Sequence, residues 1–137
     1  MDEFLDLLQE NRWLFLVVGY FFTISIETPL LLVGLSPEHP MKRRIVAGFW
    51  LTACTYPIVI LVLPELIDPG EWRLQYLLVA EVFAPVAECA VFWVAFAPLK
   101  NPWRDLGVIT LANLASFGLG ELLLHLLGMI SVADYAW

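Results

Sequence analysis

The chain alternates between long apolar stretches and short polar separators. Four apolar stretches can be drawn, at residues 13–35, 45–67, 74–97 and 106–130. A helix rises about 1.5 Å per residue, so about 20 apolar residues cross the hydrocarbon core of a bilayer. Backbone groups in lipid must be hydrogen-bonded within the segment or its neighbours, so each stretch predicts one transmembrane helix.

The separators have the composition of turns. Residues 36–44, 68–71 and 98–102 each combine proline with charge, and such clusters punctuate helices. The first dozen residues instead place Phe4, Leu5, Leu7 and Leu8 among acidic residues. This pattern predicts a short amphipathic helix that lies at the membrane interface.

Composition supports the membrane interpretation. Hydrophobic residues make up 61% of the 137 residues, charged residues 15%, and the mean hydropathy is +0.79, whereas soluble domains carry about 25% charged residues. We therefore expect an all-α integral membrane protein, a four-transmembrane-helix bundle whose partner is the lipid bilayer. No basic patch with interleaved aromatic residues suggests nucleic acid.

A gap-free shift of 61 residues lays the first half of the chain on the second. It places Glu27 on Glu88, and it also superposes several charged and proline residues that are rare in this composition. The identical pairs are Glu10 and Glu71, Arg12 and Arg73, Pro37 and Pro98, and Arg43 and Arg104, while Thr52 and Thr55 meet Asn113 and Ser116. Self-similarity at a fixed period indicates an internal repeat.

The expected organisation follows from this shift. Residues 1–12 form the interfacial segment, 13–67 the first repeat with two helices, 68–130 the second repeat, and 131–137 a C-terminal tail. Two spans per repeat preserve orientation, so the repeats should be parallel and related by an axis along the membrane normal.

Basic residues predict the orientation. Lys and Arg in short loops remain in the cytoplasm, and five of the seven basic residues flank the first and third loops: Lys42, Arg43, Arg44, Lys100 and Arg104. We expect loops 36–44 and 98–105 to be cytoplasmic and both termini to be outside. Trp13, Trp72 and Trp103, at the starts of spans, are candidate interfacial anchors.

Four acidic residues lie within the predicted spans: Glu27, Glu81, Glu88 and Glu121. The sequence shows no Lys or Arg within the spans to neutralise them. A charge at the centre of a membrane helix costs about 2.5 to 3.5 kcal/mol on insertion scales, so such residues usually face the bundle interior or a wet cavity. They can be protonated and hydrogen-bonded, bind a cation, or change protonation during a working cycle.

Six polar residues are expected near the membrane midplane. The spans drawn above place Glu27 and Glu88 there, together with polar residues of the two partner helices. The predicted midplane polar centre comprises Glu27, Glu88, Thr52, Thr55, Asn113 and Ser116.

A second group occurs only in the second repeat. Glu121 and His125 are four residues apart on one helix face, and Glu81 shares a face with Glu88. Two carboxylates and an imidazole suit Zn, Mn or Fe, so Glu81, Glu121 and His125 are a candidate metal site. A proton-handling role and a purely structural role are the alternatives. His39, in a polar loop, is expected to be solvated.

Prolines interrupt several of the predicted spans. Pro29, Pro57, Pro64 and Pro85 lie within them, and a proline removes one backbone hydrogen bond and frees a carbonyl. These residues can act as hinges, help to bind a cation, or simply kink a helix.

Three functional hypotheses remain open from the sequence. The first is a small transporter or channel-like protein that uses the intramembrane carboxylates for protons or cations, divalent metals included, and that assembles as a homo-oligomer. The second is a membrane-embedded, metal-dependent enzyme that acts on a lipophilic substrate. The third is a non-catalytic subunit of a larger membrane complex, whose polar residues only fix helix pairing.

Overall fold

The computed structural model describes residues 2–130, and the described part of the chain contains helices and no strands. The helices are α1 (Asp2–Glu10), α2 (Arg12–Gly34), α3 (Met41–Pro57), η1 (Ile58–Val62), α4 (Leu63–Leu66), α5 (Arg73–Phe96) and α6 (Pro102–Leu126). The predicted tail at 131–137 lies outside the described residues.

In the described part of the chain, four helical segments are long and apolar enough to cross a membrane, as predicted. They are Arg12–Gly34, Met41–Leu66, Arg73–Phe96 and Pro102–Leu126, where α3, η1 and α4 together make the second segment. The second and fourth begin four residues earlier than the apolar stretches. Charged residues occupy those first turns, which a hydropathy pattern excludes but a helix accepts.

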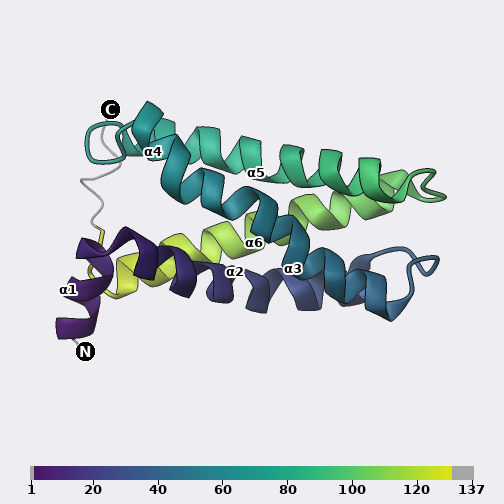
Figure 1. Cartoon of the computed structure of the whole chain (residues 1–137), viewed down its shortest axis with the longest axis horizontal. Helices are drawn as coiled ribbons and strands as arrows, with labels where there is room; N and C mark the ends of the chain where they lie inside the picture. The colour runs from purple at the N-terminus through teal and green to yellow at the C-terminus, as the bar shows by residue number, and fades with distance from the viewer. Residues whose placement is uncertain (1, 131–137) are drawn as a thin grey trace.

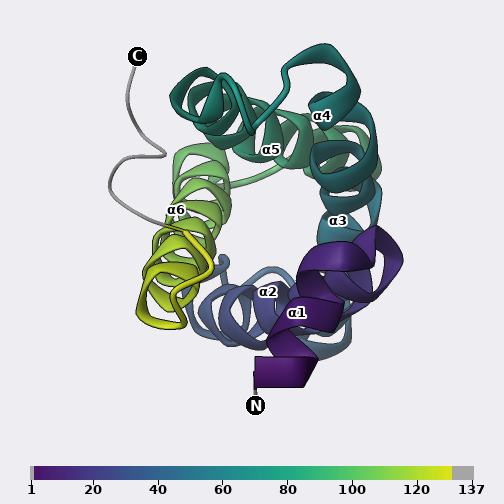
Figure 2. The same cartoon turned by 90° about the vertical axis from the view of Figure 1, so that its left-hand side faces the viewer.

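The four long helices run side by side along the molecule and alternate in direction (Figure 1). Helix α2 packs against α3 and α6, and α5 packs against the same two helices. Seen along the bundle, the helices form a ring in the order α2, α3, α5, α6 (Figure 2). Helices α2 and α5 therefore occupy one diagonal, and α3 and α6 the other.

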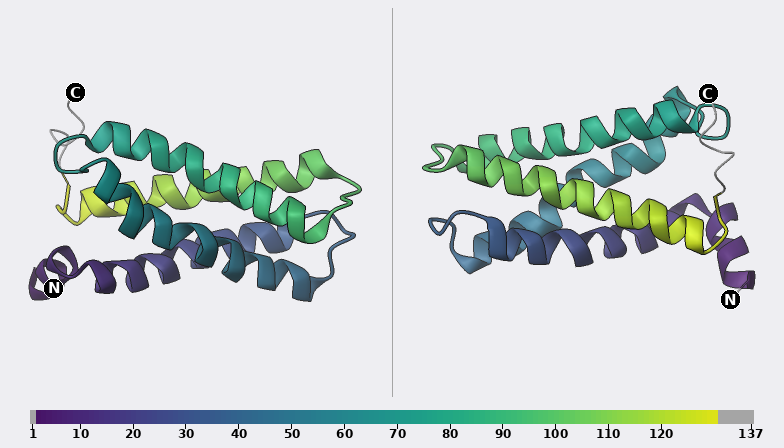
Figure 3. Two further views of the ribbon diagram at one scale, coloured as in Figure 1. Left: turned by 45° about the horizontal axis from the view of Figure 1, so that its top comes forward. Right: turned by 180° about the vertical axis from the view of Figure 1, so that it is seen from behind.

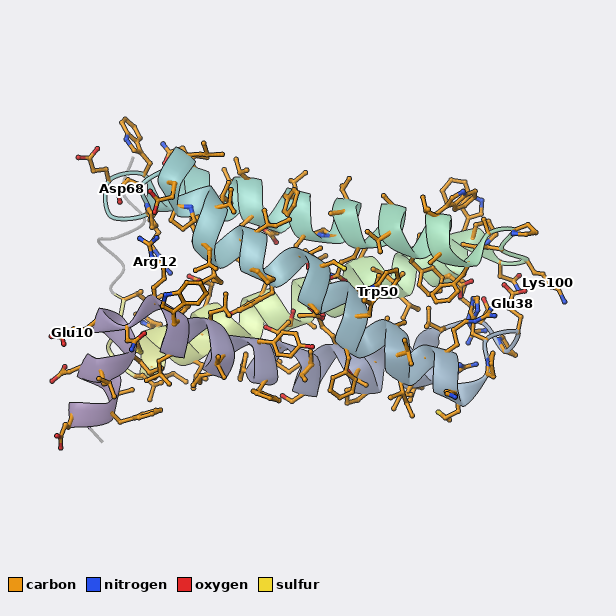
Figure 4. All side chains as sticks on the ribbon, viewed as in Figure 1. Glu10, Arg12, Glu38, Trp50, Asp68 and Lys100 are labelled. Atoms are coloured by element: carbon orange, nitrogen blue, oxygen red, sulfur yellow. The ribbon has the colours of Figure 1, made fainter. Side chains whose placement is uncertain are left out.

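The two ends of the bundle differ. One end carries α1, the turn at 67–72 and the last turn of α6, and we call it the α1 end. The connections 35–40 and 97–101 lie together at the opposite end, the loop end, as further views show (Figure 3). With side chains drawn, Glu10, Arg12 and Asp68 lie at the α1 end, whereas Glu38 and Lys100 lie at the loop end (Figure 4).

Side chains cap the first long helix at both ends. The Oδ1 atom of Asn11 accepts hydrogen bonds from the backbone N–H groups of Trp13 and Leu14, each at 3.1 Å. This is the usual role of Asn at an N-cap. At the other end, Arg104 donates through Nε to the carbonyl of Gly34 at 2.8 Å. A cation there satisfies a free carbonyl and complements the helix dipole.

The second long segment contains an irregular turn. Pro57 ends α3, the next five residues form the π-helix η1, and Pro64 follows in α4. The wider helical turn accompanies the proline, which lacks an N–H group to continue the α-helical ladder. Tyr76 of α5 donates its hydroxyl to the carbonyl of Val59 at 2.9 Å, so a backbone oxygen in this turn has a partner from a neighbouring helix.

The outside of the bundle is apolar and part of its interior is polar. Exposed side chains include Val33, Val94 and Leu126, while Glu27, Glu88 and Asp105 are among the buried ones. A soluble protein buries most of its large apolar side chains and seldom buries carboxyl groups. The distribution is therefore the one expected for helices that face an apolar surrounding.

Helices α2 and α3 approach each other closely at Gly48. A Cβ atom placed on Gly48 would lie 3.0 Å from the Cα atom of Thr28, a backbone atom that cannot rotate away. Replacing Gly48 by Ala should therefore push the helices apart and lower the free energy of unfolding by about 1 to 3 kcal/mol. Unfolding of the purified protein in mixed detergent micelles by SDS titration measures this loss.

Gly118→Ala is the matched control. A Cβ atom on Gly118 would meet no atom of the described residues within 4 Å, and alanine is the better helix former by about 1 kcal/mol. This variant should be at least as stable as the wild type. Equal stability of the two alanine variants would show that the close approach at Gly48 does not constrain the helix pair.

Candidate functional site: a buried carboxyl pair below a cavity

The structure brings together the six residues of the predicted midplane centre. Glu27 and Glu88 come from α2 and α5, on one diagonal of the ring, and each carboxyl side chain is only 2% exposed. The hydrogen-bonding partners come from α3 and α6, on the other diagonal. All four partners are buried: Thr52, Thr55, Asn113 and Ser116.

Both carboxyl oxygens of Glu27 accept a hydrogen bond. Thr52 donates its hydroxyl to Oε2 at 2.7 Å, and Ser116 donates its hydroxyl to Oε1 at 2.6 Å. One partner lies on the next helix in the chain and the other on the last. Glu27 therefore joins three helices of the bundle.

Glu88 has the corresponding environment on the opposite side. Asn113 donates from Nδ2 to Oε2 at 2.7 Å, and Thr55 donates its hydroxyl to Oε1 at 2.8 Å. Four short hydrogen bonds thus converge on one pair of acids.

The four hydrogen bonds form two pairs under the 61-residue shift. The bond between Thr52 and Glu27 becomes the bond between Asn113 and Glu88. The bond from Ser116 to Glu27 likewise exchanges with the bond from Thr55 to Glu88. Each acid therefore receives one donor from its own half of the chain and one from the other half.

Each hydroxyl in the centre has a second acceptor within reach. Thr52 Oγ1 lies 3.1 Å from the carbonyl oxygen of Gly48, Thr55 Oγ1 lies 3.2 Å from that of Leu51, and Ser116 Oγ lies 3.0 Å from that of Asn113. A hydroxyl carries one hydrogen and two acceptor lone pairs. It can donate to an ionised carboxylate, or donate to the carbonyl and accept from a protonated carboxyl group.

A cavity of about 890 Å³ leads to this centre, and its lining includes all six centre residues. At the other extreme it is lined by residues of the α1 end, among them Glu10, Arg12 and Asp68. The cavity therefore joins the α1 end to the two carboxyl groups in the middle of the bundle.

The opposite half of the bundle is filled by apolar side chains. One cluster contacts all four long helices, from Leu31 of α2 to Ile109 of α6. Its buried members are Leu31, Leu35, Ala47, Leu51, Phe92, Ile109 and Ala112. This cluster, the apolar plug, separates the carboxyl pair from the loop end.

The second predicted group is only partly assembled. Glu81 and Glu121 both line the cavity, whereas His125 is exposed and is not among the lining residues. Arg73 forms an ion pair with Glu121, with Nη2 2.7 Å from Oε2. The expectation that no basic side chain neutralises the acids is therefore wrong for Glu121, because Arg73 at the start of α5 pairs with it across the contact between α5 and α6.

His39 is not solvated as expected, since it is only 2% exposed. Its Nε2 lies 3.0 Å from Oδ2 of Asp105, whose Oδ1 accepts the backbone N–H of Ser36 at 2.7 Å. The rings of Phe92 and Phe96 flank the imidazole. A polar loop residue became buried because the first loop folds back over α5 and α6, which no local pattern indicates.

Arginine side chains complete this network at the loop end. Arg44 donates to the carbonyl oxygens of Leu32, Ser36 and His39. It therefore holds the end of α2 and the following loop in place. The network ties the first loop to α6, so the loop end is closed by polar contacts as well as by the apolar plug.

Glu38, His39 and Asp105 have ligand atoms within 4.8 Å of one another, and no other such triplet occurs among residues 2–130. Arg43 Nη1 lies 3.2 Å from His39 Nδ1 and can only donate. The imidazole hydrogen is then on Nε2, which donates to Asp105. Both imidazole nitrogens thus have protein partners, whereas the Glu38 carboxylate accepts the backbone N–H of Lys100 at 3.0 Å. The predicted metal residues Glu81, Glu121 and His125 do not form such a triplet.

The fold and the site define a class: an all-helical bundle with four helices long enough to span a membrane, an internal carboxyl pair, and a cavity open toward one end. No family model, curated protein or solved structure matches the chain.

Proposed function

We propose that the chain is a small integral membrane transporter or channel-like protein in which Glu27 and Glu88 bind protons or cations. The main support for this proposal is the cavity. It reaches the two buried carboxyl groups from the α1 end, while the apolar plug closes the other side. A binding site in mid-bundle with one open side is the arrangement that alternating access requires.

The surface of the bundle supports insertion in a bilayer. Its exposed apolar side chains surround the long helices, and Trp13, Trp72 and Trp103 are 68%, 51% and 90% exposed. Exposed tryptophans near helix starts suit the membrane interface. With the basic loops 36–44 and 98–105 in the cytoplasm, the α1 end faces outside, and the cavity opens outward.

The internal repeat is also part of the proposal. Two parallel two-helix units related by 61 residues account for the paired hydrogen bonds of Glu27 and Glu88. Glu81 and Glu121 have Tyr20 and Ile60 as counterparts. The carboxyl pair is then the symmetric centre, and the acids nearer the cavity mouth belong to one repeat only.

The hydroxyl groups favour proton exchange as the working step. Thr52, Thr55 and Ser116 can each redirect a hydrogen to a backbone carbonyl when a carboxyl group takes up a proton. The hydroxyl and carboxyl groups of the centre then keep a hydrogen-bond partner whether the acid is ionised or protonated. A buried group left without a partner would cost about 1 to 3 kcal/mol. The site can therefore change protonation without large rearrangement.

Release toward the loop end requires movement of the apolar plug. Pro57 and the π-helix η1 lie in the second long segment next to the carboxyl centre, and Pro85 lies one turn before Glu88. Such irregular turns provide hinges. A path across the bundle must pass the plug, and assembly into a homo-oligomer would let the helices move against a second copy.

Proton flux in liposomes tests this function. The purified protein should dissipate an imposed pH gradient faster than protein-free liposomes do, as measured with an internal pH-sensitive dye. Thr55→Val should slow this flux about tenfold, because valine keeps the shape but removes the donor to Glu88, a loss of about 1.4 kcal/mol.

Thr110→Val is the matched control for this experiment. Thr110 also lies on a long helix and also donates to the carbonyl four residues earlier, at 2.9 Å, but contacts neither acid. Its flux should equal that of the wild type. Wild-type flux no faster than the lipid background would reject transport of protons, and equal flux in both valine variants would remove the hydroxyl exchange from the mechanism.

A further inference from the structure

The cavity is much larger than an ion needs. Its volume of about 890 Å³ compares with about 30 Å³ for one water molecule. Small-molecule sites in proteins typically measure about 300 to 1,000 Å³. The size of the cavity is therefore that of a site for an organic molecule.

The middle of the cavity has apolar walls. Between the α1 end and the carboxyl pair it is lined by aromatic and aliphatic side chains from all four long helices. They include Phe15, Phe22, Tyr56, Ile60, Leu77 and Phe117. These walls suit an apolar body, and aromatic faces also attract a cationic group.

The charges of the cavity favour a positive ligand. In the described range 2–130, seven acidic residues and two arginines line it, namely Glu10, Glu27, Glu65, Asp68, Glu81, Glu88 and Glu121, with Arg12 and Arg73. Each arginine already pairs with a carboxylate, Arg12 with Glu65 at 2.6 Å and Arg73 with Glu121 at 2.7 Å. Among the residues that the structure describes, no basic side chain lines the bottom, where Glu27 and Glu88 lie.

Glu81 provides an acid between the mouth and the bottom. It lies on the same face of α5 as Glu88, two turns nearer the α1 end, or about 10 Å by the helix rise. Its side chain is half-buried and lines the cavity. A cation that enters from the α1 end therefore passes Glu81 before it reaches Glu88.

We propose that the cavity binds a hydrophobic organic cation, an amine or quaternary ammonium whose charged head lies at Glu27 and Glu88 and whose apolar body lies against the aromatic walls. The proposal rests on the proposed function in taking the carboxyl pair as the binding site, and it names the class of substrate. The carboxyl pair would recognise the charge of the ligand, and the aromatic walls would recognise its apolar body. The two contributions can therefore be tested separately.

A matched pair of probes separates charge from shape. Trimethyl(2-phenylethyl)ammonium carries the charge, and (3,3-dimethylbutyl)benzene is its neutral carbon isostere. Isothermal titration calorimetry on the full chain in lipid nanodiscs, with protein-free nanodiscs as the blank, measures both. The cation should bind saturably and at least tenfold more tightly than the isostere.

Variants locate the head group. Glu27→Gln and Glu88→Gln should each weaken binding of the cation at least tenfold, while Glu71→Gln, an acid in an exposed turn outside this cavity, should leave it unchanged. Equal binding of cation and isostere would mean that the cavity takes any apolar molecule, and this would overturn the proposal. So would unchanged binding in both cavity variants, or no binding of the cation at all.

Proton flux and binding of the ammonium probe can fail independently of each other. Proton flux that depends on Glu27 and Glu88, without binding of the ammonium probe, would leave the transporter proposal standing and reject the organic cation. Binding of the ammonium probe without any proton flux would reject proton transport and leave the organic-cation site standing.

Discussion

Glu88→Gln should reduce proton flux in liposomes on the order of 100-fold, since proton transfer by a positioned acid typically contributes about 10²- to 10⁴-fold. Glutamine cannot take up or release a proton near neutral pH, yet it fits the site. Its amide oxygen can accept from Asn113, and its NH₂ group can donate to the hydroxyl of Thr55, which then donates to Leu51. The loss would therefore reflect chemistry and not misfolding.

Glu27→Gln should have an effect of similar size. Its partners Thr52 and Ser116 are both hydroxyls with a second acceptor, so either can accept from the new NH₂ group. Circular dichroism and gel-filtration profiles equal to those of the wild type check the fold of both variants. Glu71→Gln serves as the control for loss of one negative charge. Wild-type flux in both cavity variants would exclude the carboxyl pair from transport.

Asp105→Ala should lower the free energy of unfolding by about 3 kcal/mol, the scale expected when one partner of a buried charged network is removed. The carboxylate is fully buried and accepts from Ser36 and His39. Its loss leaves a backbone N–H and an imidazole N–H without partners, each costing about 1 to 3 kcal/mol. SDS titration of the purified protein measures the change.

Glu65→Ala is the comparison for this experiment. Glu65 also forms an ion pair, with Arg12 at 2.6 Å, but the two side chains are 65% and 55% exposed. Exposed pairs contribute about 0 to 1 kcal/mol. Equal stability of Asp105→Ala and Glu65→Ala would contradict the expectation. It would mean that the hydrogen bonds of Asp105 to Ser36 and His39 do not hold the first loop in place.

The helical class and the four long segments were predictable because they depend on local pattern. A run of apolar residues longer than a bilayer core, bounded by proline and charge, has few alternatives to a helix. The candidate centre was predictable for a related reason. Glu27 and Glu88 are rare residues in apolar surroundings, and their burial cost forces them toward partners inside the bundle.

The loop-end network was not predictable in the same way. His39 follows a proline-rich turn and Asp105 lies in the first turn of a helix, where polar residues are ordinary. Their pairing joins positions 66 residues apart. The ion pair of Arg73 with Glu121 was not predictable either. A long side chain at the start of a helix can point toward the surroundings or toward a neighbouring helix, and the sequence pattern does not distinguish the two.

The helices, their approximate ends and the positions of Glu27 and Glu88 along them follow from the amino-acid sequence, because hydropathy and helix rise act along one dimension. The packing of the four helices places α2 and α5 on one diagonal, so that each acid receives donors from both halves of the chain. It also decided that a cavity reaches them from the α1 end. Both depend on how four helices pack around one another, and apolar faces of similar composition do not specify that order.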